Sequence, residues 1–474
     1  MTTIPSGYGP SAGPRAFEGP RPVARERLSV IDRVQTAAVF YIGAWTLSPP
    51  LFVSDLARRG AVVAFGLWLV CELTRRTGVI ARPTLAVIIA FFFLAYTTAV
   101  TAYLDGVQTV VGGIQTIVFV MFLIFFESAR RAGLMKYRWV LWGGLLLLPI
   151  WMATTVSALA TNRHVARILT RSSEEGVAYM SAGVGGYGLV YSTVLAIPLL
   201  LYLMANLPPL SASRGNTGSR VWSLAQRIVL GAGVVLALLL VARAGYSIAV
   251  AALMLGLITY FLLRGQVRNR SFRIGIAIAI SAVVLAVSQT SLISGALDGL
   301  SDLAYGTSYR AKIDDLRTSL ETDTSVGTVY GRTERYMRSL TLFAQNPIVG
   351  TLSFRDVGKH SAVLDVFAQF GLFGGAAFVY LLFATPLMLL RASAARVQMS
   401  GAAAAFLIIL AVCTIFNDLS ASMGFVAYIL YPLAMTYQSQ RTSSHSRMVR
   451  VRVGPPPGPA PGPPPYQARA RPPQ

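Results

Sequence analysis

The sequence predicts an all-helical membrane protein, a bundle of about twelve transmembrane helices with one large extracytoplasmic loop. Of its 474 residues, 54% are hydrophobic and only 13% are charged, whereas soluble domains carry about 25% charged residues. The apolar residues form blocks close to the ~20 residues that a helix needs to cross a bilayer. Low charge and long apolar blocks together exclude a water-soluble globular enzyme of this size.

Twelve apolar blocks define the predicted membrane-spanning segments. They cover residues 34–53, 61–74, 84–103, 107–126, 139–160, 182–206, 226–242, 245–263, 274–293, 361–390, 401–418 and 423–438. The first nine therefore occupy 34–293, and the last three occupy 361–438. Only a few residues around Arg243 separate the seventh block from the eighth.

Both ends of the chain differ in composition from the apolar blocks. Residues 1–33 are rich in Pro, Gly and Arg and have no apolar run, which predicts a disordered basic tail. No small-residue cleavage site accompanies the first apolar block, so we do not expect a cleavable signal peptide. Residues 439–474 become Pro-rich, which is typical of a polyproline-like tail, either simply solvated or a ligand for a cytoplasmic partner.

The distribution of basic residues predicts the orientation of the bundle, because cytoplasmic connections of membrane proteins are enriched in Lys and Arg. If the N-terminus is cytoplasmic, most of the 41 Lys and Arg residues lie in inside segments, and many of the others lie in one long loop. Long loops cross the membrane largely regardless of charge. Both termini are therefore predicted to be cytoplasmic, and the net charge of +22 needs no nucleic-acid partner.

The long loop, residues 294–360, lies on the extracytoplasmic side in this orientation. Long loops within compact structures are often functional. From Tyr330 to Gln345 the loop has only Gly331 as a helix breaker, which predicts a helix that ends before Asn346-Pro347. Four polar residues recur there at helical spacing and share one face: Arg332, Arg335, Tyr336 and Ser339.

Extracytoplasmic arginines are candidates for binding phosphate, since the planar guanidinium fork matches phosphate oxygens. Besides Arg332 and Arg335, the candidates include Arg163 and Arg167 in the 161–180 loop. Contact with lipid headgroups, or pairing with acidic residues of the same loop, is the alternative for any single arginine. Arg243 lies between two apolar spans without an acidic neighbour. An arginine deep in hydrocarbon costs about 2.5–3.5 kcal/mol on insertion scales, and a bound anion would offset this cost.

His360 follows Gly358-Lys359 where the long loop meets the tenth block. With an ordinary pKa near 6.5, a histidine there is a candidate general base, and a structural hydrogen-bonding role is the alternative. Three scattered histidines and the two cysteines, Cys71 and Cys413 in apolar blocks, predict neither a metal site nor a cofactor.

Four segments, in this order and spacing, resemble the O-antigen ligase/polymerase superfamily of bacterial membrane proteins. They are Gly331-Arg332-Thr-Glu-Arg335-Tyr336, Asn346-Pro347-Ile-Val-Gly350, His360-Ser361 and Gln369-Phe-Gly371-Leu-Phe-Gly374. The predicted spans and the single large loop are similar to the same architecture, a type-C glycosyltransferase-like bundle. Ser361 stands where the family often has Asn after the histidine, and this departure is less typical of its ligase branch.

The resemblance implies a metal-independent, inverting glycosyltransferase in the bacterial inner membrane. Such an enzyme transfers a glycan from undecaprenyl diphosphate to the acceptor hydroxyl of another lipid-linked repeat unit on the periplasmic side, in O-antigen, capsule or exopolysaccharide biosynthesis. It implies a catalytic role for His360 and diphosphate binding by Arg243 and Arg332, to which the helix face adds Arg335 and Tyr336. Its implied partners are the lipid-linked oligosaccharide, membrane lipids and other polysaccharide export or assembly proteins.

Three alternatives stay open on the sequence alone. An O-antigen ligase would transfer the glycan to lipid A core instead. A transporter or flippase for a lipid-linked sugar would use interrupted helices, and Gly183 to Gly188 and Pro198 are placed to interrupt the sixth span. A transferase that uses polyprenyl-phosphate monosaccharides typically has paired acids in its first extracytoplasmic loop, where this chain has Asp55 alone.

Overall fold

A computed structural model describes residues 28–104, 106, 114–162, 165–169, 174–207, 217–263, 301–302, 305–306, 310–311, 313–314, 327–353, 357–393 and 397–438. By its internal contacts the chain splits into two units, of which Leu28–Met435 is the larger. All contacts discussed below lie within this unit. The predicted tails at 1–33 and 439–474 and the predicted span at 274–293 lie almost entirely outside the described residues. The regular structure of the described residues is entirely helical.

Six described helices are long and apolar enough to cross a membrane, as expected for a membrane protein. They are α4 (Leu85–Leu104), α7 (Arg138–Thr161), α10 (Tyr187–Ala205), α11 (Thr217–Ala244), α17 (Ala362–Ser393) and α18 (Val397–Phe416). The prediction of an all-helical membrane protein is thus confirmed for the described residues, while the number of twelve crossings stays a prediction.

Shorter or less apolar helices complete the bundle. They are α1 (Val30–Leu47), α2 (Pro49–Val53), α3 (Asp55–Thr74), α6 (Ile114–Ala132), η1 (Leu134–Tyr137), α8 (Val165–Ile168), α9 (Glu174–Ser181), α12 (Ser247–Leu263), α16 (Gly327–Gln345), α19 (Ala421–Phe425) and η3 (Val426–Leu430). The predicted loop helix is confirmed as α16, which begins three residues earlier than expected. Every predicted block among the described residues overlaps a helix.

Local sequence signals explain where the first helices begin. Ser29 and Asp32 form a capping box, in which each side chain accepts from the other residue's backbone N–H, and α1 therefore begins at Val30. The predicted tail boundary at residue 33 is wrong for this reason. The predicted span 34–53 is divided after Ser48, because Pro49 starts a new helix at the position where its missing N–H costs nothing.

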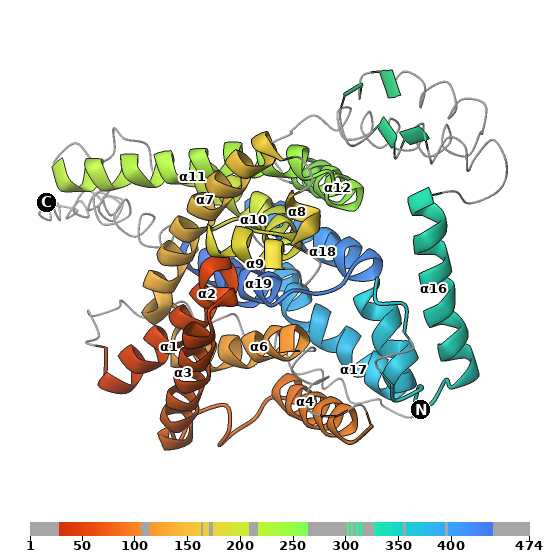
Figure 1. Cartoon of the computed structure of the whole chain (residues 1–474). Helices are drawn as coiled ribbons and strands as arrows, with labels where there is room; N and C mark the ends of the chain where they lie inside the picture. The colour runs from red at the N-terminus through yellow and green to blue at the C-terminus, as the bar shows by residue number, and fades with distance from the viewer. Residues whose placement is uncertain are drawn as a thin grey trace, which may run out of the picture. The chain divides into compact units, whose positions relative to one another are not determined.

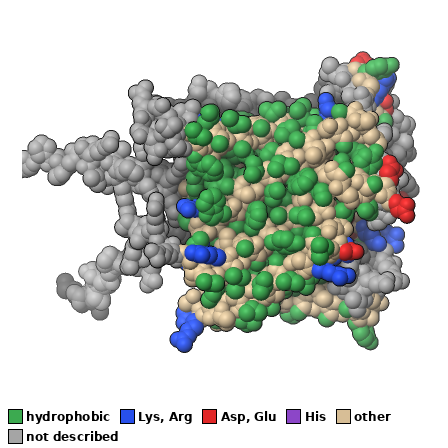
Figure 2. Space-filling view, turned by 60° about the vertical axis from the view of Figure 1, so that its left-hand side comes forward, with side chains coloured by type: hydrophobic (Ala, Val, Ile, Leu, Met, Phe, Trp, Pro, Cys, Tyr) green, Lys and Arg blue, Asp and Glu red, His purple; other side chains and the backbone are tan. Residues whose placement is uncertain are grey.

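The arrangement of the helices separates a buried centre from an apolar surface. α10 is largely buried and lies against α11, α12 and α18 (Figure 1). Pro198 remains inside α10 without breaking it, whereas the glycines from 183 to 186 precede the helix. Figure 2 shows one face of the molecule as a broad apolar field whose coloured charges lie toward two opposite edges. Such a face suits contact with lipid acyl chains.

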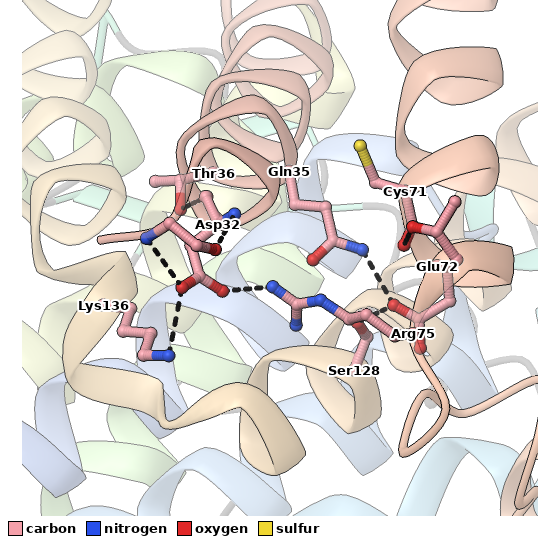
Figure 3. Close-up of polar contacts among 10 residues, drawn as sticks. Asp32, Gln35, Thr36, Cys71, Glu72, Arg75, Ser128 and Lys136 are labelled. Atoms are coloured by element: carbon pink, nitrogen blue, oxygen red, sulfur yellow. Dashed lines mark hydrogen bonds and ion pairs between the residues drawn. The ribbon is translucent and has the colours of Figure 1, made fainter. Parts of the chain in front are cut away.

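A polar network joins α1, α3, α6 and η1 at one end of the bundle (Figure 3). Asp32 of α1 forms ion pairs with Arg75 and with Lys136, the latter at 3.1 Å. The fully buried Glu72 carboxylate accepts hydrogen bonds from the Gln35 amide at 2.8 Å and from the Ser128 hydroxyl at 2.6 Å. These residues flank the connections that are predicted to be cytoplasmic. The network therefore lies at the end of the bundle for which a cytoplasmic location is predicted.

Replacing Glu72 by Leu is expected to destabilise the bundle. The change leaves the buried donors of Gln35 and Ser128 without their acceptor, and each orphaned donor costs about 1–3 kcal/mol. The measurement is the melting temperature of the purified protein in detergent. Asp55→Asn is the matched control, because its pair with Arg58 is exposed and such pairs contribute little. Equal melting temperatures for Glu72→Leu and the wild type would contradict a stabilising role for the network.

Candidate functional site

A cavity of about 880 Å³ occupies the opposite end of the bundle from the polar network. On α1, Thr46 and Leu47 line the cavity, whereas Asp32 at the other end of the same helix belongs to the network. On α6 the same relation holds between Gln115 and Ser128. The cavity therefore lies at the end that the charge distribution predicts to be extracytoplasmic.

The lining of the cavity combines apolar, neutral polar and charged groups. Apolar side chains from α4 and α17 form its deeper wall, including Phe93 and Phe378. Besides the tyrosines described below, the neutral hydrogen-bonding side chains are Thr46, Thr97, Thr98, Thr101, Gln115, Thr116, Gln369, Asn417, Ser420 and Ser422. The charged or titratable ones among the described residues are Lys359, His360, Asp365 and Asp418. A volume of this size matches small-molecule and cofactor sites, which typically measure about 300–1,000 Å³.

The buried carboxylate of Asp365 fixes the backbone at His360. The Asp365 Oδ2 atom accepts from the backbone N–H of His360 at 2.9 Å and of Ser361 at 3.1 Å. Its Oδ1 atom accepts from the Ser339 hydroxyl of α16 at 2.6 Å. The Ser361 hydroxyl in turn accepts from the Leu364 N–H and caps the start of α17. The loop helix and the start of α17 are thereby joined at the wall of the cavity.

Hydrogen bonds determine the tautomer of the His360 ring. Arg335 Nη1 lies 3.0 Å from His360 Nε2, and His360 Nδ1 lies 2.6 Å from the carbonyl oxygen of Lys359. Because a guanidinium group has only donors, Nε2 accepts and Nδ1 donates, which is one of the two neutral forms of the ring. His360 can therefore accept a substrate proton at Nε2 only when the Arg335 contact is exchanged for the substrate.

Asp418 is a cavity residue that the sequence analysis did not single out. It lies between α18 and α19 in the wall of the cavity, where the residue is exposed although many protein atoms surround its carboxyl group. This enclosure raises the pKa of Asp418 to about 6, the Asp365 carboxylate adds to the rise, and Lys359 opposes it. The sequence signal that could have indicated it is an acidic residue at the last position of the predicted span 401–418. In the structure α18 ends at Phe416, so Asp418 lies in the connection that follows.

Tyrosines form a further part of the cavity wall. The rings of Tyr187 and Tyr246 line it, with centroids 6.1 Å apart, and the buried Tyr191 ring lies 4.5 Å behind Tyr187. The Tyr187 hydroxyl donates to the carbonyl of Asp418 at 2.7 Å, and the Tyr246 hydroxyl donates to the carbonyl of Ala166 at 2.9 Å. These bonds hold both rings in place beside the charged residues.

The structure brings some of the predicted site residues together. On α16, Arg335, Tyr336 and Ser339 share the face that contacts the bundle, as predicted from their spacing. Tyr336 donates to the carbonyl of Phe416 at 2.9 Å, so it holds α16 against the end of α18. Met337 and Leu340 of the same helix are exposed.

Arg335 contacts His360 but, like the other predicted arginines, it is not among the described residues that line the cavity. Arg243 is exposed in the last turn of α11, three residues before Tyr246, and is not among the described lining residues. The backbone of Arg332 belongs to α16 and that of Arg167 to α8, but their side chains lie outside the described residues. Arg163 lies outside them altogether. Their predicted roles in diphosphate binding stay predictions.

Within the described part of the chain, no three His, Cys, Asp or Glu side chains gather in a way that would hold a metal ion. Neither models of known protein families nor curated protein sequences match this chain. The chemistry of the cavity residues is therefore the main support for a function.

Proposed function

We propose that this chain is a polysaccharide polymerase of the bacterial inner membrane. In this proposal it transfers a glycan from undecaprenyl diphosphate to the acceptor hydroxyl of another lipid-linked repeat unit on the periplasmic side. The observation that carries it is one cavity at the opposite end of the bundle from the polar network. His360, Lys359 and Asp418 line this cavity together with tyrosines and neutral polar side chains. The resemblance of the four sequence segments supports the same assignment.

The reaction is a single displacement at the anomeric carbon. The acceptor hydroxyl loses its proton to a base, its oxygen forms the new glycosidic bond, and the bond to the diphosphate breaks with the electron pair leaving on the diphosphate oxygen. Direct displacement inverts the anomeric carbon. Fixed cations in a site that excludes water stabilise the charge that develops on the leaving group. In this proposal the charges come from Lys359, an exposed residue of the cavity lining, and from Arg335, an exposed residue that contacts His360, and the bound substrate itself would exclude water from them.

Two cavity groups are suited to accept the proton. His360 is the base that the resemblance implies, and its Nε2 atom is an acceptor in the tautomer described above. Asp418 is the base that the local electrostatics favour, because a carboxylate with a pKa of about 6 is ionised at neutral pH and still basic enough to take a proton. We assign proton acceptance to Asp418 and positioning of the reacting groups to His360, and their variants distinguish the two roles.

The tyrosine wall suits the sugar rings of the substrate. Aromatic rings carry a negative face, and the C–H groups of a pyranose present a weakly positive one. The neutral amide and hydroxyl side chains of the cavity are suited to form hydrogen bonds with sugar hydroxyls.

Reconstitution tests the enzyme assignment directly. The purified protein in vesicles, supplied with a lipid-linked oligosaccharide and no ion gradient, is expected to lengthen the glycan. Movement of the lipid-linked oligosaccharide across the membrane without elongation would contradict the proposal and favour a transporter. Transfer to lipid A core, with no transfer to a second lipid-linked unit, would contradict the polymerase assignment and favour a ligase.

Replacing Tyr246 by Ala is expected to raise the KM for the glycan about 2- to 10-fold, because aromatic contacts contribute about 0.5–1.5 kcal/mol. Tyr246→Phe keeps the ring and removes the hydroxyl that donates to Ala166, so its KM should lie close to that of the wild type. Phe92→Ala is the control, since Phe92 is 63% exposed on α4 and does not line the cavity. Steady-state elongation rates give the KM values, and equal values for Tyr246→Ala and Phe92→Ala would exclude contact with the sugar.

A further inference from the structure

The loop that follows α16 is joined to a break in α17 by backbone hydrogen bonds. The N–H of Thr351 donates to the carbonyl of Ala368 at 2.9 Å, and the N–H of Leu372 donates to the carbonyl of Pro347 at 2.8 Å. Along α17, Ala368 precedes the break in the helix and Leu372 follows it, so the loop is bonded to both sides of the break. The polar backbone groups that the break exposes are thus partly satisfied by the loop.

Two glycines make this close contact possible. Gly371 interrupts α17 with a φ of 62°, and Gly350 in the loop has a φ of 76°. A Cβ atom on Gly371 would lie 2.3 Å from the carbonyl oxygen of Ile348, and one on Gly350 would lie 2.4 Å from the carbonyl of Gln369. Both positions therefore require glycine, first because of the positive φ and second because a Cβ atom would clash with the facing backbone. This contact fixes the position of the loop along the axis of α17.

Large apolar side chains are exposed where the loop and the helix meet. Ile348 and Val349 of the loop are 62% and 49% exposed, and Leu372 and Phe373 of α17 are 54% and 72% exposed. We call these four residues the elbow patch. Exposed apolar side chains that gather in this way mark a surface with a partner.

The length of α17 indicates what covers the elbow patch. α17 has 32 residues, more than the ~20 that span the hydrocarbon core. Counting about 20 residues back from Arg391, the charged residue in its last turn, reaches the neighbourhood of Leu372. The break in α17 thus lies at the outer boundary of the hydrocarbon, and the loop residues beside it lie at the same depth.

We propose that the elbow patch inserts into the outer leaflet, so that its four side chains reach the lipid acyl chains while the backbone of the loop after α16 stays at the boundary of the hydrocarbon. The partner is the bilayer itself, because the patch is continuous with the surface of a membrane-spanning helix. Insertion ties the C-terminal end of α16 to the membrane surface and thereby holds Arg335, ten residues before Gln345, over His360.

Spin labels test the insertion in nanodiscs of phosphatidylcholine, with the full-length protein. Single cysteines are placed at Ile348, Val349 and Phe373 in a Cys71→Ser background, and the fully buried Cys413 is retained. Oxygen concentrates in lipid and a nickel chelate stays in water, so their collision rates with each label report its surroundings. Phe92→Cys on the exposed face of α4 is the lipid reference, and Glu334→Cys on the exposed side of α16 is the water reference.

We expect the elbow labels to favour oxygen and to lose collisions with the nickel chelate, as the label at position 92 does. Collisions like those at position 334 would overturn the proposal. Three adjacent positions are measured so that one variant that fails to fold does not decide the result. The outcome is independent of any enzymatic activity.

Discussion

Replacing Asp418 by Asn is expected to lower the rate of glycan transfer by about 10²–10⁴-fold, the usual contribution of a general base. The amide has nearly the same size as the carboxyl group but cannot accept the acceptor's proton. The protein atoms around the carboxyl group, together with the Asp365 carboxylate, raise the pKa of Asp418 to about 6, although the residue is exposed at the cavity. Above this pH the carboxylate is ionised and accepts the proton, and below it the group is protonated and inactive. The wild-type rate should therefore rise as pH increases through about 6.

Initial elongation rates on both sides of this pH measure the effect, and Asp418→Asn should lose the rise along with the rate. Asp55→Asn is the control, because Asp55 is exposed, pairs with Arg58 and does not line the cavity. A pH dependence that survives in Asp418→Asn and disappears in His360→Ala would assign the base to His360 instead. Full polymer formation by His360→Ala at normal expression would remove His360 from the mechanism.

The spacing of residues in the sequence was sufficient to predict that Arg335, Tyr336 and Ser339 share one face of α16, whereas the contact of this face with the bundle comes from the structure. Arg335, Tyr336 and Ser339 fall on one face of any helix that includes them, and all three make contacts from that face. The contact of Arg335 with His360 is shown only by the structure. Helical periodicity and the stop at Asn346-Pro347 are local properties, so a single sequence reveals them.

Asp418 and the elbow could not be predicted in this way, because each depends on residues that are remote in the sequence. The pKa of Asp418 is raised by enclosure among elements that span much of the chain, and no pattern around Asn417-Asp418 indicates it. Gly350 and Gly371 were noted only as parts of the resembling segments. Glycine is needed at both positions because the loop backbone contacts the backbone of α17 there, and this contact is visible only in the folded structure.

Replacing Arg335 by Met is expected to weaken binding of the lipid diphosphate and to lower the transfer rate by about 10²–10³-fold, the cost of removing one donor to a developing anion. Arg335→Lys should recover part of the rate, since it keeps the charge but loses the planar fork. Arg58→Met is the matched control, because Arg58 is an exposed arginine that pairs only with the exposed Asp55 among the ion pairs described.

Two measurements separate the roles of Arg335, namely the affinity for undecaprenyl diphosphate and the rate of transfer. An arginine that holds the diphosphate changes both, whereas an arginine that only orients His360 changes the rate and its pH dependence while the affinity stays constant. In the second case the Nε2 atom of His360 loses its donor, and a substrate hydroxyl takes that place more readily. Unchanged affinity in Arg335→Met would therefore move the diphosphate away from α16 and toward Lys359, which lines the cavity and whose backbone carbonyl accepts from the Nδ1 atom of His360.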